Sequence, residues 1–134
     1  MRTVFADTFY FLALVNKSGQ AHGKAVAFSN TFQGRIVTTS WVLTEFADAM
    51  SSPYNRQAFH VFYSWLQTEP QIVIWPPEPI LFNSGMALFA ARSDKEWSLT
   101  DCISFVSMQQ EQISEALTAD HHFEQAGYLA LLKQ

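Results

Sequence analysis

The sequence predicts an α/β protein, a three-layer α/β/α sandwich around a mostly parallel central sheet. Short β-rich runs such as residues 36–39 (IVTT) and 72–75 (IVIW) alternate along the chain with longer segments of helical periodicity. Strands that alternate with helices are joined by right-handed crossovers, which make the sheet parallel and cover both of its faces. The 134 residues contain no repeat or long linker, so we expect residues 1–134 to form a single domain.

The expected strands are short and apolar, and the third is stopped by two prolines that cannot donate to a sheet ladder. In chain order they are residues 3–6, 35–39, 71–75, 113–118 and 128–132, of which the last two have the weaker pattern. The expected helices lie between these strands, at residues 8–15, 19–33, 41–51, 53–68, 78–92, 99–111 and 121–126.

Residues typical of helix starts support three of these boundaries. Pro53 follows a serine, which fits the first helical position after an N-cap. Ser98 and Asp101 have the spacing of a capping box, in which each side chain accepts from the other residue's backbone amide. Thr118 or Asp120 is expected to cap the last helix.

The composition excludes several classes of protein. With 49% hydrophobic residues the chain is not disordered, and its single cysteine allows neither an internal disulfide nor a thiolate metal cluster. No segment offers the roughly 20 apolar residues of a membrane span. Asp7 interrupts the apolar N-terminal stretch, which a secretion signal tolerates poorly, so we expect a cytoplasmic protein. The net charge of −4 means that a nucleic acid would have to meet a local basic patch.

Four acidic residues from distant parts of the chain are expected to meet. Asp7 and Asp120 follow predicted strands, Asp101 opens a helix, and Glu45 lies at the margin of an apolar helical stripe while Asp48 points to solvent. Ligand sites of parallel sheets lie at the carboxyl ends of the strands. Each acid also has a simpler interpretation: the three aspartates as helix caps, and Glu45 as an ordinary boundary residue.

Clustered carboxylates require a counterion. Two of them about 4 Å apart repel by roughly 4 kcal/mol at an effective dielectric constant near 20, so four must take up protons or bind a cation. Oxygen ligands select hard ions such as Mg²⁺ or Mn²⁺. Such an ion can polarise a phosphodiester and generate hydroxide from bound water.

The segments around these acids resemble those of PIN-domain ribonucleases, especially the VapC-type toxins of bacterial toxin–antitoxin pairs. The resemblance covers most of the chain and its motifs occur in the family's order. They are residues 4–8 (VFADT), 41–46 (WVLTEF), 98–105 (SLTDCISF) and 117–128 (LTADHHFEQAGY).

The resemblance implies a metal-dependent endoribonuclease with an α/β/α fold. By matching position, the metal-binding and catalytic acids would be Asp7, Glu45, Asp101 and Asp120, with Mg²⁺ or Mn²⁺ as cofactor. Thr8 would help to position a ligand or water. Many members have another acid two residues after the fourth one.

At that position this chain has His122, which would contact phosphate or merely pack beside Phe123. Loss of one anionic ligand leaves the number of metal ions, one or two, open. Two other functions stay open as well: a catalytically inactive PIN-like module that binds RNA or protein, and a nuclease acting on DNA.

The helix expected at residues 53–68 indicates possible protein partners. The helix at residues 53–68 has one apolar stripe with Phe59 and Phe62 and a second with Val61 and Trp65, so it is either deeply buried or covered by a partner. In the resembling toxins a small antitoxin covers a groove near this region and homodimers are common, so we expect a homodimer and an antitoxin partner.

Few residues are candidates for binding RNA, since the eight basic residues form no cluster along the chain. Arg92 and Lys95 precede the third acid and either flank the site or lie in solvent. Trp97 either stacks on a base or packs in the core.

Overall fold

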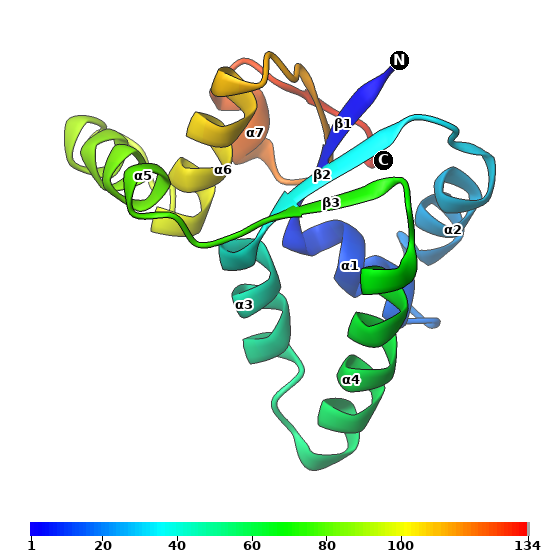
Figure 1. Cartoon of the computed structure of the whole chain (residues 1–134). Helices are drawn as coiled ribbons and strands as arrows, with labels where there is room; N and C mark the ends of the chain where they lie inside the picture. Colours follow the sequence, from blue (N-terminus) through cyan, green and yellow to red (C-terminus); the bar gives the residue numbers. More distant parts are fainter. Residues whose placement is uncertain (134) are drawn as a thin grey trace.

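The computed structural model describes residues 1–133, and within them five strands and seven helices alternate as predicted (Figure 1). The strands are β1 (Thr3–Ala6), β2 (Arg35–Thr39), β3 (Ile72–Trp75), β4 (Glu115–Leu117) and β5 (Leu129–Ala130). The helices are α1 (Thr8–Val15), α2 (His22–Thr31), α3 (Ser40–Ala49), α4 (Pro53–Thr68), α5 (Pro79–Ala91), α6 (Leu99–Gln110) and α7 (His121–Gln125).

The five strands form one sheet in the order β3-β2-β1-β4-β5, and every pair is parallel. The predicted α/β class is confirmed, and the sheet is entirely rather than mostly parallel. Figure 1 shows α1, α3 and α4 below the sheet and α6 and α7 above it, which are the two outer layers. The chain runs from β1 outward to β3 and then returns to add β4 and β5 on the other side, so the topological switch point lies between β1 and β4.

The two strands with the weaker sequence pattern, β4 and β5, are shorter than predicted, and the late start of β4 has a local reason. Gln112 has a φ of 55°, which turns the chain sharply after α6, and the amide of Ile113 still donates to the carbonyl of Met108. Pairing with β1 therefore begins only at Phe5 with Ala116. The second predicted helix starts three residues late because a turn closed by Gly19 precedes it.

Aromatic side chains fill the core on both sides of the sheet. Below it, Phe11 stacks on Phe46 with ring centroids 5.5 Å apart, which joins α1 to α3. Above it, Phe105 meets Phe123 edge to face at 4.9 Å and joins α6 to α7. These contacts hold together, within each layer, the helices that carry or directly follow the four acids.

Helix α4 is half-buried, so the interpretation of a deeply buried helix is wrong. Its first stripe, which includes Phe62 and Leu66, packs against the core, whereas Val61 and Trp65 of the second stripe are exposed.

Helix α5 contacts the rest of the molecule mainly through α6. The two helices lie so close that a Cβ on Gly85 would come within 2.3 Å of Ile103 Cγ1. Outside this contact the helix extends away from the sheet (Figure 1). Among residues 1–133 no helix has both the length and the apolarity to cross a membrane.

Candidate functional site

The sheet register places Asp7 beside Thr118 at the switch point. Ala6 pairs with Leu117, so the next residues of β1 and β4 leave the sheet side by side. Thr118 is fully buried, and its hydroxyl donates to Asp7 Oδ2 over 2.9 Å. The predicted meeting of strand ends thus brings the first acid to the segment that carries the fourth.

Asp7 is a buried carboxylate in an unfavourable electrostatic environment. Its residue is only 5% exposed, and although it stands at the N-cap of α1 its side chain makes no capping hydrogen bond. Burial raises the pKa of Asp7 to about 7, against the opposing effect of the hydrogen bond from Thr118. The charges of Asp101 and Glu45 raise this pKa further. Asp7 is therefore placed to bind a proton or a cation rather than to cap its helix.

Glu45 is tied to the same end of the sheet through Thr8. The hydroxyl of Thr8 donates to Glu45 Oε1 at 2.5 Å, which links the first turn of α1 to the second turn of α3. Helix α3 begins where β2 ends, with Thr39 accepting from the amide of Val42. Glu45 is half-buried and Asp48 is exposed, as the helical stripe predicted.

Asp101 combines two interpretations that the sequence left as alternatives. The predicted capping box is present: Ser98 Oγ accepts from the Asp101 amide at 3.0 Å, and Asp101 Oδ2 accepts from the Ser98 amide at 3.1 Å. Asp101 Oδ2 also lies 3.1 Å from His122 Nδ1. Burial raises the pKa of Asp101, and the charge of Asp120 acts in the same direction.

Asp120 also caps a helix and contacts a histidine. Its Oδ1 accepts from the His122 amide at 2.9 Å at the start of α7, as predicted for one of the two candidate caps. His122 Nδ1 lies 3.5 Å from the same oxygen. His122 is half-buried between Asp101 and Asp120, so it does more than pack beside Phe123, whereas His121 is exposed.

The four predicted acids form one connected network at the switch point. Thr118 joins Asp7 to the fourth segment, His122 joins Asp101 to Asp120, and the charges of Glu45 and Asp101 act on Asp7. The network is looser than a closed metal cage. Within residues 1–133, the group of three ligand atoms that lie within 4.8 Å of one another belongs to Asp120, His121 and His122.

The donor set fits a hard divalent cation. Within the described chain, the ion pairs of lysine and arginine all go to other acids, namely Arg2–Glu115, Arg35–Glu111, Arg92–Asp94 and Lys133–Glu124. The buried carboxylates at the switch point therefore have no lysine or arginine among residues 1–133 to neutralise them. Carboxylate oxygens that no lysine or arginine neutralises are ligands that Mg²⁺ and Mn²⁺ favour.

Sequence reasoning missed the part that Thr118 plays in the site. We expected it only as one possible helix cap, but it donates to Asp7 and accepts from the Asp120 amide at 3.0 Å. A signal was present: a hydroxyl residue at the end of the strand beside β1 must face the residue that ends β1. Only the strand order identifies that neighbour.

Two candidate RNA contacts have structural roles instead. Trp97 is buried, donates from Nε1 to Gln125 at 2.9 Å and meets Phe105 edge to face, so it packs in the core. Arg92 pairs with Asp94 and covers the Trp97 ring.

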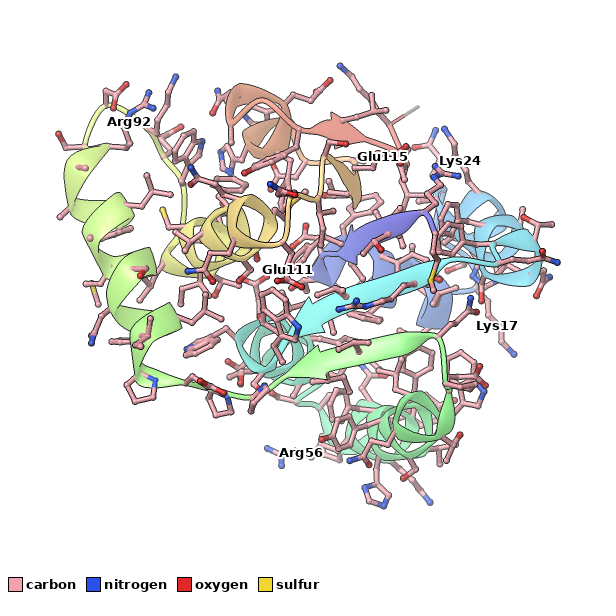
Figure 2. All side chains as sticks on the ribbon, turned by 45° about the horizontal axis from the view of Figure 1, so that its top comes forward. Lys17, Lys24, Arg56, Arg92, Glu111 and Glu115 are labelled. Atoms are coloured by element: carbon pink, nitrogen blue, oxygen red, sulfur yellow. The ribbon has the colours of Figure 1, made fainter. Side chains whose placement is uncertain are left out.

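The basic side chains do not gather into one patch. Figure 2 shows Lys17, Lys24, Arg56 and Arg92 at separate places around the periphery of the molecule. A nucleic acid at the acids would therefore have to be held there by contacts other than a continuous basic surface.

Comparison with known proteins identifies the fold. No family model matches the sequence, and no curated protein matches it significantly. The structure is similar to VapC20 of Mycobacterium tuberculosis, a sarcin–ricin loop cleaving toxin, with a TM-score of 0.84 and 21% identity over 94% of this chain and 96% of that chain. It is also similar to FitAcB from Neisseria gonorrhoeae, with a TM-score of 0.65 and 16% identity over 95% of this chain and 94% of that chain. The chain therefore has the PIN-domain fold that its motifs predicted.

Proposed function

We propose that this chain is a metal-dependent endoribonuclease and the toxin of a toxin–antitoxin pair, acting in the cytoplasm as a single domain. The observation that carries the proposal is the network of two buried and two half-buried carboxylates at the switch point, to which the described lysines and arginines supply no countercharge. The similarity to a toxin that cleaves the sarcin–ricin loop supports RNA over DNA as the substrate.

In this proposal Asp7, Glu45, Asp101 and Asp120 hold Mg²⁺ or Mn²⁺. A bound divalent ion supplies charge neutralisation at the scissile phosphate and lowers the pKa of a water molecule. Hydroxyl groups of the chain orient two of these carboxylates. Thr8 holds the carboxylate of Glu45, and Thr118 holds that of Asp7, so both acids present their other oxygens in a fixed orientation.

His122 occupies the place where many PIN-domain ribonucleases have a further acid. Its ring lies against both Asp101 and Asp120 and restricts their orientation. An imidazole adds no negative charge to the site, so we propose that the site binds a single divalent ion rather than two. The same ring is available to contact a phosphate of the substrate.

Titration with Mn²⁺ or Mg²⁺ tests the metal site without an activity assay. The wild-type protein is expected to gain about 2.7 kcal/mol of stability at a metal concentration 100 times the dissociation constant, because the ion binds the folded state alone. For a chain of this size this raises the melting temperature by about 8 °C. The Asp7→Asn variant should show a much smaller rise. An equal rise in both proteins, or none in either, contradicts the proposal.

One observation favours an inactive PIN-like module that binds RNA or protein. The tightest ligand group among residues 1–133 contains two histidines and a single acid, so the carboxylates are less closely gathered than a rigid metal cage requires. Cleavage of single-stranded RNA in Mn²⁺ and in EDTA separates the two functions: RNA that stays intact under both conditions while still binding supports the inactive module.

Helix α5 supports the proposed homodimer. Phe82, Met86 and Phe89 recur at helical spacing on one side of this helix and are exposed, and Ile80 is 73% exposed. Since α5 projects from the body (Figure 1), the same helix of a second copy is the proposed occupant.

Light scattering measures this directly, with an expected mass of twice 15.2 kDa. Met86→Glu should yield the monomer, whereas Val61→Glu on α4 should leave the dimer intact. A monodisperse wild-type monomer contradicts the dimer. The exposed side of α4, with Val61 and Trp65, is instead the proposed contact for the antitoxin.

A further inference from the structure

An apolar groove lies directly beside the candidate site. It has a volume of about 460 Å³ and is formed by one side of α1, the turn that follows α1, and Ala119 from the segment after β4. Phe9, Leu12 and Asn16 recur at helical spacing along its α1 wall, and Gln20 lies in the turn. The groove is separate from the acids, and the proposed chemistry makes no use of it.

The groove and the acids share two chain segments. Phe9 follows Thr8, whose hydroxyl holds Glu45, and Ala119 separates Thr118 from Asp120. The residues at one end of the groove are therefore direct chain neighbours of residues that belong to the site. The α1 wall of the groove continues to Asn16, seven residues and about 10 Å further along the helix.

The lining of the groove is neutral and mostly apolar. None of its lining residues is charged, in contrast to the carboxylates of the candidate site. Phe9, the aromatic residue of the lining, is half-buried and keeps part of its ring accessible. Such a lining does not bind a phosphate, but it suits the flat face of a nucleobase, since stacking on an aromatic ring accepts any base.

The far end of the groove carries amide groups suited to the edge of a base. Asn16 accepts at Oδ1 from the Ser18 hydroxyl at 3.1 Å, which leaves its Nδ2 as a donor. Asn16 and Gln20 are exposed, and so is the ammonium group of Lys17 beside them. A phosphate that follows the bound base would meet this positive charge.

We propose that this groove binds the unstacked nucleobase next to the scissile phosphate, with Phe9 as its stacking platform. The inference rests on the proposed ribonuclease function, because a phosphodiester bound at the acids would bring its neighbouring nucleotide toward Phe9 and Ala119, the chain neighbours of Thr8 and Asp120. It assigns to Phe9 the part of a binding residue for single-stranded RNA, which is the form in which bases are free to be splayed out.

The test measures binding of short single-stranded RNA in the non-cleaving Asp7→Asn background. Phe9→Leu, which keeps apolar volume but removes the aromatic face, should weaken binding by about 5- to 150-fold. Phe9→Trp should retain binding. Tyr54→Leu, which removes an exposed aromatic ring on α4, is the matched control and should leave affinity unchanged. Thermal melting of each variant confirms that it is folded.

An RNA strand without bases completes a double-mutant cycle. The penalty of Phe9→Leu should vanish with this strand, because the ring then has nothing to stack on. An equal penalty with and without bases, or no penalty at all, overturns the proposal; the second result is also what a groove reserved for a protein segment would give. Cleavage by the wild type is measured separately. If the wild type cleaves RNA but the Phe9→Leu penalty does not depend on the bases, only the proposed role of the groove is wrong. If the wild type leaves RNA uncut, the proposed nuclease function is wrong.

Discussion

Replacing Asp7 with asparagine is expected to reduce metal-dependent RNA cleavage by about 1000-fold, because loss of one ligand removes several kcal/mol of charge stabilisation. The substitution is nearly isosteric, and the new amide oxygen can still accept from Thr118 as Asp7 Oδ2 does. The loss is therefore attributable to charge rather than to a changed fold. Initial rates of cleavage in Mn²⁺, with EDTA as the blank, measure the effect.

Asp48→Asn is the matched control for this experiment. Asp48 lies on α3 close in sequence to Glu45 but is exposed, so the same chemical change there should leave the cleavage rate within about twofold of wild type. Asp101→Asn is a less direct probe, because Asp101 also closes the capping box of α6. Full metal-dependent activity in Asp7→Asn would contradict the assignment of the site.

Asp7 is also expected to make the metal-free protein less stable as pH rises from about 4 to about 7. In the unfolded chain the Asp7 carboxyl has a pKa of 3.8, whereas burial raises the pKa of the folded-state group to about 7. Between these values the folded state binds the extra proton, so raising the pH removes stability until the folded-state group has ionised. The difference in pKa corresponds to about 4 kcal/mol at most.

Urea unfolding in EDTA, near pH 4.5 and pH 8, checks this prediction on wild type and Asp7→Asn together. Other groups titrate in both proteins, so the informative quantity is the difference between the two free energies of unfolding. Asp7→Asn should be similar to wild type at the lower pH and more stable, by up to about 4 kcal/mol, at the higher pH. A variant that is less stable than wild type near pH 8 would show that the ionised Asp7 is stabilised without metal.

The fold class and the candidate acids could be predicted from the chain because their signals are local. β-branched runs such as residues 36–39 are bounded by segments of helical periodicity. Ser98 and Asp101, three residues apart, form a capping box that indicates the start of a helix. Glu45 and Asp48 were separated correctly by helical geometry alone. These inferences need only neighbours within one or two turns of chain.

The strand order and the contacts across it were decided by the tertiary structure. That β1 lies between β2 and β4 depends on which strands pair, and no local pattern shows that Thr118 stands opposite Asp7, 111 residues away. The position of His122 between Asp101 and Asp120 likewise needs α6 and α7 to be packed together. The amino-acid sequence by itself determined which side chains carry charge and which elements bear them. The burial that raises the pKa of Asp7 comes from long-range packing, since desolvation depends on every segment that covers a group. The groove likewise needs Ala119 to be packed against α1.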